Sequence, residues 1–155
     1  MIVVIGGGHA GIEAAMAAFR LGAPVTLITL RKNGIGQMSC NPAIGGLGKG
    51  HIVKEVDALG GLMPKAIDQT GIQFRTLNSS RGPAVRASRA QADRFEYQLW
   101  MEKTVTSKIK VIEGEVSKIN IKNSRVQSIE LKTGETISCH SLVVTTGTFM
   151  RGLMH

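Results

Sequence analysis

Three glycines near the start of the chain have the spacing G-x-G-x-x-G, at Gly6, Gly8 and Gly11. The β-branched run Ile2–Ile5 precedes them, which is typical of a strand buried in a parallel sheet, and a helical repeat of apolar residues follows. In such a unit the first glycine permits a tight turn, the second lets a pyrophosphate approach the backbone, and the third lets the helix pack on the strand. The pattern predicts a dinucleotide site at the helix amino end, where the helix dipole favours an anion.

A second candidate reactive group is the thiol of Cys40. This residue lies between Ser39 and Asn41 in the glycine-rich segment Asn33–Gly50. The segment begins where a second strand, Val25–Leu30, is expected to end. Ligand crevices in open α/β sheets lie at the carboxyl ends of strands, so we expect this loop to border the dinucleotide. Its polar setting exposes the thiol more than most, and a helix amino end nearby could lower its pKa. Composition alone leaves two interpretations open, a chemically active thiol and a packed small hydrophobe.

Arginines are concentrated in one part of the chain. Five of them fall within twenty residues that contain a single acid, Asp93; they are Arg75, Arg81, Arg86, Arg89 and Arg94. Guanidinium groups bind phosphates by bidentate contact. The whole chain has 19 Lys and Arg against 11 Asp and Glu, a net charge of +8, which supports polyanion binding. Three interpretations stay open: nucleic-acid contact, cofactor contact and a solvated basic surface.

The identity of the dinucleotide is not settled by these residues. The fingerprint expects Asp or Glu about 20 residues after the glycines, where it accepts from a ribose hydroxyl. The chain has Thr29, Leu30, Arg31 and Lys32 there. The basic pair Arg31 and Lys32 allows a 2′-phosphate, and hence NADPH, or it is simply a pair of solvated loop cations.

Length and composition indicate a globular domain with a core, because the chain has 155 residues, 43% apolar and 19% charged. Its two cysteines form no C-x-x-C pair, which argues against a disulfide framework or a zinc site and favours a reducing, cytoplasmic compartment. We expect no metal. No apolar run is long enough to span a membrane, and the start of the chain lacks the basic leader of a signal peptide, so we expect no membrane association.

Periodicity predicts the remaining elements. The first helix should bury Ile12, Ala15, Met16 and Phe19. A helix is expected at His51–Leu59, a break at Pro64, a strand at Ile72–Leu77, and a helix capped by Ser88 and running to about Ser107 with Phe95 and Leu99 in the core. Four short strands should then form an antiparallel meander, at Ile109–Ile112, Val116–Ile121, Val126–Leu131 and Thr136–Cys139. A buried strand, Leu142–Thr145, should end at Thr146 and Gly147. The fold class is α/β, a Rossmann-like domain with a parallel sheet and a small antiparallel β-meander.

This order of elements resembles the FAD domain of two-dinucleotide-binding flavoproteins. Four segments, GGGHAGIEAA, GQMSCNPAIGGLGKGHIVKEVDALGG, AIDQTGIQF and GPAVRASRAQADR, are similar to the family of tRNA uridine 5-carboxymethylaminomethyl modification enzymes, MnmG or GidA. The resemblance runs from Ile2 to about Thr148 and is densest between Gly6 and Arg94.

The resemblance implies FAD as the cofactor and assigns site residues. The pyrophosphate of FAD is expected on the turn and helix start, and Val116 is expected to meet the adenine side through its backbone. Cys40 corresponds to a cysteine with a catalytic role, as nucleophile or proton donor near the uracil. In this family no acid follows the second strand, so Arg31 and Lys32 no longer argue for NADPH. The expected cofactor-binding residues are Gly6, Gly7, Gly8, His9, Ala10, Gly11, Val116, Thr146 and Gly147.

The resemblance also implies a reaction and partners. Such enzymes add an aminomethyl or carboxymethylaminomethyl group at C5 of the wobble uridine of certain tRNAs. FAD mediates transfer of a one-carbon unit from methylenetetrahydrofolate, NADH reduces the flavin, the protein is a homodimer, and a GTPase, MnmE, completes an α2β2 complex. Family chains are several times longer, so residues 1–155 are expected to be the N-terminal segment of the FAD-binding domain, without the NADH-binding and C-terminal helical regions.

Two other interpretations belong beside this one. The chain could be a truncated, non-catalytic remnant that binds FAD or tRNA. It could also be related to the folate-dependent tRNA uracil-5 methyltransferases, which share the glycine-rich start but not the SCNPAIGG loop in this form.

Overall fold

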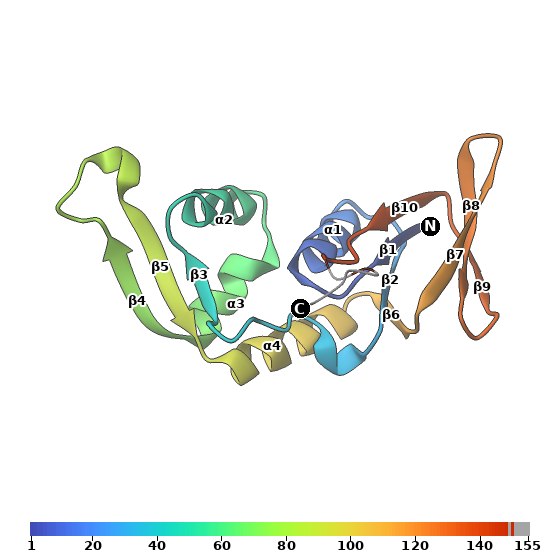
Figure 1. Cartoon of the computed structure of the whole chain (residues 1–155), viewed down its shortest axis with the longest axis horizontal. Helices are drawn as coiled ribbons and strands as arrows, with labels where there is room; N and C mark the ends of the chain where they lie inside the picture. Colours follow the sequence, from blue (N-terminus) through green and yellow to red (C-terminus); the bar gives the residue numbers. More distant parts are fainter. Residues whose placement is uncertain (149, 151–155) are drawn as a thin grey trace. The chain divides into compact units, whose positions relative to one another are not determined.

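The computed structural model describes residues 1–148 and residue 150. The chain divides into two compact units, coloured along the sequence in Figure 1. The first unit contains Met1–Gly36 and the chain from Glu102 onward, and the second contains Gln37–Met101. Each unit is described by itself.

The first unit is built on a four-stranded parallel sheet with the strand order β10-β1-β2-β6. The strands are β1 (Ile2–Ile5), β2 (Val25–Thr29), β6 (Lys110–Glu113) and β10 (Ser141–Val144). All five residues of β2 and the last three of β1 are buried, as expected for central strands of a parallel sheet covered on both faces. The predicted Rossmann-like parallel sheet is confirmed.

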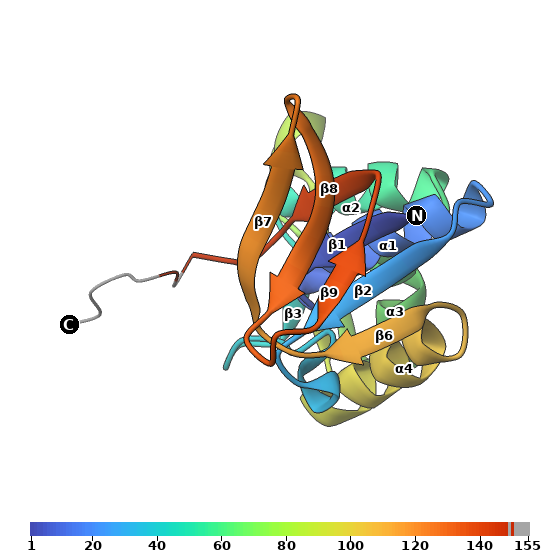
Figure 2. The ribbon, with the colours of Figure 1, turned by 90° about the vertical axis from the view of Figure 1, so that its right-hand side faces the viewer.

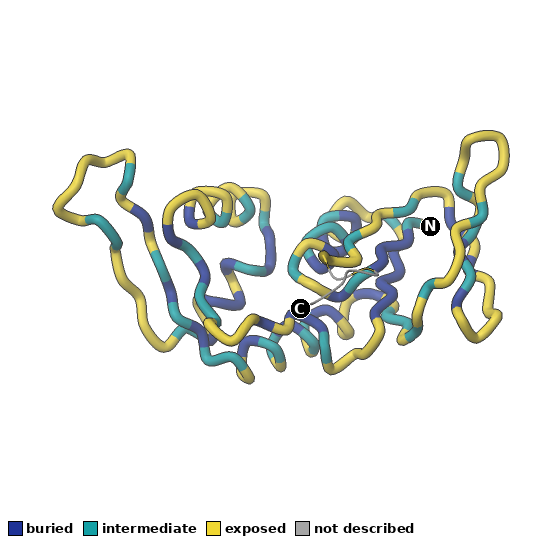
Figure 3. Tube along the Cα trace, in the orientation of Figure 1, coloured by how far each residue is buried: buried dark blue, intermediate teal, exposed yellow. Residues whose placement is uncertain are grey.

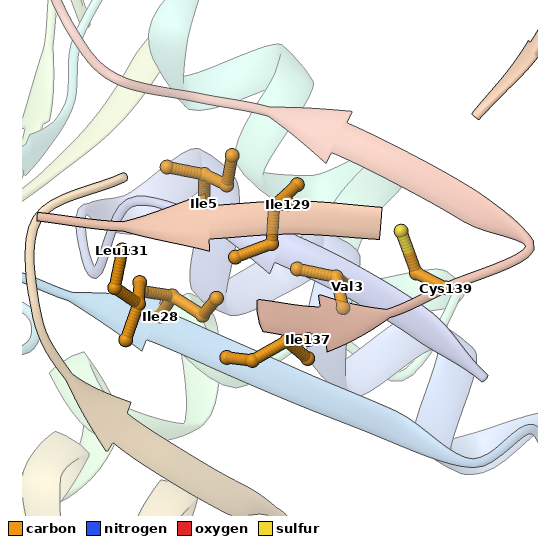
Figure 4. Close-up of a cluster of buried hydrophobic side chains, with 7 residues drawn as sticks. All are labelled: Val3, Ile5, Ile28, Ile129, Leu131, Ile137 and Cys139. Carbon is orange, nitrogen blue, oxygen red and sulfur yellow. The ribbon is translucent and has the colours of Figure 1, made fainter. Parts of the chain in front are cut away.

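One predicted strand of the meander, Ile109–Ile112, corresponds instead to β6 and pairs parallel to β2 in this sheet. The other three strands form the antiparallel meander, which covers one face of the sheet. It consists of β7 (Val116–Lys122), β8 (Arg125–Leu131) and β9 (Thr136–Ser138), and Figure 2 shows it lying across β1 and β2. Figure 4 shows its side chains meeting those of the sheet in one cluster, formed by Val3, Ile5, Ile28, Ile129, Leu131, Ile137 and Cys139. Burying each of the large aliphatic side chains contributes about 1.5–3 kcal/mol, so the meander is held mainly by this cluster.

Helix α1 (His9–Arg20) packs against β1, β2 and β10. It buries Ile12, Ala15 and Met16, as the periodicity predicted. Phe19 was expected to join them but is 39% exposed, because the last turn of the helix buries Ala18 instead. The ammonium of Lys108 lies 5.9 Å from the centre of the Phe19 ring and covers part of it.

The second unit contains a three-stranded antiparallel sheet with the order β3-β5-β4. The strands are β3 (Ala43–Gly45), β4 (Gly71–Leu77) and β5 (Ala87–Ala92). Helices α2 (Lys49–Ala58) and α3 (Leu62–Thr70) pack against the sheet. Short 3₁₀ turns occur at Lys32–Gly34 in the first unit and at Pro83–Val85 in the connection between β4 and β5.

Ser88 does not cap a helix, contrary to the sequence-based prediction. It lies in β5, which pairs with β3 on one side and β4 on the other, so sheet pairing overrides the weak strand preference of this alanine-rich segment. Helix α4 (Arg94–Thr106) begins later, after Asp93. The carboxylate Oδ1 of Asp93 accepts from the backbone N–H groups of Phe95 and Glu96 at 2.9 and 3.0 Å and caps the helix.

The later helix start also changes which residues α4 buries. Phe95 and Leu99, predicted to be core residues, are 78% and 59% exposed. Tyr97, Met101 and Val105 are buried in their place, at spacings of four residues along one helix face.

Two further predictions were wrong in detail. Pro64 does not interrupt the chain but is the third residue of α3, where its missing N–H would have had no intrahelical acceptor. The segment 33–50 was expected to lack regular structure, but it contains β3, and α2 begins within it, at Lys49. None of the helices among residues 1–148 and 150 is both long and apolar enough to cross a membrane.

Candidate functional site

The glycine turn of the first unit begins at Gly6, directly after β1. Its φ of +112° is one that other L-residues rarely adopt, and a Cβ there would collide with the carbonyl oxygen of Thr145. Its N–H donates to the Ile28 carbonyl at 2.8 Å, which fixes the turn against β2. The predicted role of Gly6 in a tight turn is therefore visible in the geometry.

Gly7 and Gly11 permit close packing around the turn. A Cβ on Gly11 would collide with the Gly6 carbonyl oxygen, and one on Gly7 would lie 2.6 Å from Oγ1 of Thr29. Helix α1 can therefore approach the turn only because position 11 has no side chain, as the motif predicted.

Gly8 differs from its neighbours, because a Cβ added there would meet nothing within 4 Å. It is the N-cap of α1, with φ −75° and ψ 177°, and its carbonyl accepts the first helical bond from Ile12 N–H at 2.9 Å. The first turn of the helix, which includes His9 and Ala10, contains no acidic residue. An open space thus faces the positive end of a helix dipole, which is the arrangement that binds a pyrophosphate.

Thr145 stabilises this turn from the neighbouring strand, and sequence reasoning missed it. Its hydroxyl donates to the Ile5 carbonyl at 2.7 Å, and its N–H donates to the same oxygen at 2.9 Å. A threonine directly after an apolar strand was the available signal. That strand was predicted to be buried, but β10 lies at the edge of the sheet, and its Val143 and Val144 are 37% and 52% exposed. Thr146 and Gly147 (φ +80°) follow it, beyond the carboxyl end of β10, which pairs with β1.

The carboxyl end of β6 supplies a second missed residue. Glu113 lies opposite Thr29 in the parallel register, and its Oε2 accepts from the backbone N–H of Lys32 at 3.0 Å. An acid at the end of β2 is therefore supplied by the adjacent strand, which no spacing rule could show. Val116 follows closely, begins β7 and packs half-buried against the core cluster.

Cys40 belongs to the second unit and is exposed, as expected from its polar surroundings. Its neighbours make local hydrogen bonds: the Ser39 hydroxyl donates to the Asn41 carbonyl at 3.2 Å, and Ala43 N–H donates to the same oxygen at 2.9 Å. The other thiol, Cys139, is buried in the first unit, and burial raises its pKa. Of the two cysteines, only Cys40 presents its thiol to solvent.

A cavity of 340 Å³ lies in the second unit between the sheet and helices α2 and α3. Its lining combines apolar and charged side chains, among them Ile44, Val53, Ile67, Phe74, Lys54, Asp57 and Asp68. The turn that leads from β3 into α2 packs tightly on β5, because a Cβ on Gly45 would collide with the Ser88 carbonyl.

The structure separates the predicted arginines into three places. Arg75 and Arg89 are direct cross-strand partners on β4 and β5, Arg81 and Arg86 lie in the connection between these strands, and Arg94 opens α4. Within the described part of the chain, no group of three or more His, Cys, Asp or Glu side chains is arranged to hold a metal ion.

Comparison with known proteins gives a consistent result over the whole chain. Residues 1–155 match the family described as Glucose inhibited division protein A, GidA. Two curated relatives are named tRNA uridine 5-carboxymethylaminomethyl modification enzyme MnmG: that of Syntrophotalea carbinolica is 51% identical and that of Geotalea uraniireducens 52% identical, each over 99% of this chain. The chain spans about a quarter of the length of these relatives (25%).

Solved structures agree with this comparison. Aquifex aeolicus GidA in its form II crystal superimposes with a TM-score of 0.92 at 52% identity, covering 95% of this chain and 25% of that protein. A GidA-related protein from Thermus thermophilus has a TM-score of 0.66 at 13% identity over 96% of this chain and 53% of that protein, a likeness that concerns the fold alone. With a family match over its whole length, the chain belongs to the Glucose inhibited division protein A (GidA) family.

Proposed function

We propose that this chain is the FAD-binding part of an enzyme that adds a (carboxymethyl)aminomethyl group to C5 of the wobble uridine of certain tRNAs, using a folate-derived one-carbon unit. The observation that carries the proposal is the open space at Gly8, at the amino end of α1, in a chain 51–52% identical to proteins named for this modification. The proposal for FAD rests on the fit of the turn and on the family.

In this proposal the glycine turn holds the pyrophosphate of FAD, through the backbone of Gly6, Gly7, Gly8, His9, Ala10 and Gly11. Val116 meets the adenine side through its backbone, and Thr146 and Gly147 lie along the cofactor. Support comes from the sheet, because the end of β1 and the ends of its neighbours β2 and β10 meet at one edge, where α/β folds bind ligands. When bound, FAD supplies the redox chemistry of the one-carbon transfer.

Cys40 is the proposed catalytic thiol, acting as a nucleophile or as a proton donor near the uracil. Its exposure supports this role, since a thiol must be accessible to react. NADH as reductant, a GTPase of the MnmE type in an α2β2 complex, a homodimeric state and a cytoplasmic location complete the proposal by family likeness.

The test of this function is the substitution Cys40→Ser in the protein that carries this chain. We expect the modified wobble uridine to disappear from tRNA, measured by nucleoside mass spectrometry, while the purified protein keeps its flavin. The matched control is Cys139→Ala, which removes the buried thiol and should leave the modification in place. Unchanged modification in Cys40→Ser would remove this residue from the mechanism.

A further inference from the structure

The two strands β4 and β5 with their connection, residues 78–86, form a hairpin that we name the arginine hairpin. Residues 69–92 contain four arginines and no Asp or Glu. Figure 3 shows β4 and the connection as mostly exposed, and every residue of β4 from Ile72 to Thr76 is exposed. The hairpin is thus a basic, solvent-facing element of the second unit.

One face of the hairpin arranges polar side chains in rows. Arg75 lies directly opposite Arg89, and Gln73 lies directly opposite Gln91. Directly opposite residues point to the same side of a sheet, so both guanidinium groups and both amides share one face. These four side chains and Leu77 line a surface hollow of 300 Å³. Across β5, the residue opposite Arg89 is Gly45, which adds no side chain to the row.

The two guanidinium groups lack acidic partners. Neither Arg75 nor Arg89 forms an ion pair with an acid in the described part of the chain. The polar contact of Arg89 is a long one, from Nη2 to Oδ1 of Asn41 at 3.5 Å. A third cation is near: Lys49, whose ammonium donates to the Ala43 carbonyl at 3.0 Å, has its pKa lowered by burial and by Arg89.

This arrangement is unfavourable for the free protein. Like charges directly opposite each other on a sheet are destabilising, and no described carboxylate forms an ion pair with either arginine. An anion held between the two guanidinium groups would remove the repulsion and use their bidentate geometry, and the flanking amides can donate to the same ligand.

We propose that the Gln73–Arg75–Arg89–Gln91 face of the arginine hairpin binds the phosphodiester backbone of an RNA. This inference rests on the proposed function, which supplies an RNA substrate. The seven residues of β4 extend over roughly 20 Å, and Arg81 and Arg86 continue the positive charge beyond the strands. A single pyrophosphate occupies far less than this length, whereas a polymer with repeated phosphates matches it. Such contacts position an RNA and read no sequence.

The test measures binding of an unmodified tRNA transcript by fluorescence anisotropy over a salt series. The double variant Arg75→Gln/Arg89→Gln should bind roughly 100-fold more weakly, since each of the two lost charge-assisted contacts is worth about tenfold or more. The slope of log K against log salt should fall by about 1.4–1.8, which is roughly 0.7–0.9 for each lost phosphate contact. Arg75→Lys/Arg89→Lys should keep most of the slope but lose affinity, because lysine binds phosphate as a point charge.

The matched control is Lys118→Gln/Lys122→Gln, which removes two exposed charges from β7 in the first unit. Its affinity should stay within about twofold of the unsubstituted protein, because separated surface charges are screened by salt. An equal loss in this control would show a general effect of net charge and would overturn the inference.

An FAD titration of the same variants separates the two sources of phosphate. The arginine variant is expected to bind FAD like the unsubstituted protein. Weakened FAD binding with unchanged tRNA binding would assign the face to the cofactor and overturn the inference. Unchanged binding of both ligands would identify a solvated basic surface, which also overturns it while the proposed function stands. If the unsubstituted protein binds no tRNA, the RNA part of the proposed function fails with it.

Discussion

The three glycines of the motif are the same residue type but lie in different physical environments. A Cβ would collide with backbone oxygen at Gly6 and at Gly11, whereas at Gly8 it would meet open space. The spacing predicted the tight turn at Gly6 and the close packing at Gly11, because both follow from the geometry of a strand–turn–helix unit, and the approach of a pyrophosphate at Gly8 stays a prediction. Thr145 and Glu113 were missed, since they reach the turn and the end of β2 only through strand pairing over more than 80 residues of sequence.

The two thiols make a residue-scale prediction, because sequence left the character of Cys40 open and the structure separates it from Cys139 by exposure. At pH 8, iodoacetamide should alkylate Cys40 in the native protein. Cys139 should react roughly 100-fold more slowly or not at all, because its thiol is buried, its raised pKa leaves less thiolate, and access requires local opening. Peptide mass spectrometry over a time course measures both rates.

The raised pKa of Cys139 also determines how the contribution of this thiol to folding stability depends on pH. A native pKa above the unfolded one means that the folded protein keeps a proton that the unfolded chain loses. The stabilisation from this retained proton is therefore fully present below the ordinary thiol pKa of about 8.5 and is lost as pH rises above it.

In the alkylation experiment, equal rates for the two native thiols would contradict this account of their environments.

At the scale of elements, prediction succeeded where the pattern of apolar residues was compatible with one type of secondary structure. The β-branched β1 and the alternating strands of the meander became the sheet and its cover. Prediction failed at Ser88, because an alanine-rich segment has no strong preference and its strand pairing is set by β3 and β4. Helix α4 is therefore capped by Asp93 rather than by Ser88. The capping bonds of Asp93 depend on β5 ending at Ala92.

The packing of α1 on the glycine turn gives a prediction for Gly11→Ala. Alanine is favoured over glycine inside a helix by about 1 kcal/mol, but here its Cβ would collide with the Gly6 carbonyl oxygen. Overpacking of this kind costs about 1–3 kcal/mol, so we expect a net loss of stability and a lower Tm in thermal unfolding.

Gly82→Ala is the matched control for this change, because a Cβ there meets nothing within 4 Å and its φ is −61°. It should unfold at the temperature of the unsubstituted protein. If Gly11→Ala were as stable as this control, the helix would not be held against the turn as described.

At the scale of the whole molecule, the chain combines a dinucleotide-type unit with a unit that exposes a thiol and a basic hairpin. The parallel sheet and the glycine turn belong to the first unit, and Cys40, Arg75 and Arg89 belong to the second. The family match extends over both units, which makes the proposed function a property of the two together. The division into two units could not be predicted, because composition changes little between them and the chain leaves the first unit and returns to it.

The central claim is that the open space at Gly8 is the place of the FAD pyrophosphate, and Gly8→Ala tests it most directly. At φ −75° alanine fits the backbone without strain, and its Cβ enters the open space rather than the protein, so the fold should be kept. We predict that FAD titration, followed by flavin absorbance, shows binding to the unsubstituted protein and to Gly82→Ala. Gly8→Ala should bind at least about tenfold more weakly, while its Tm falls by only a few degrees, because alanine is a poorer N-cap than glycine. FAD binding in Gly8→Ala equal to that of the unsubstituted protein would contradict the account.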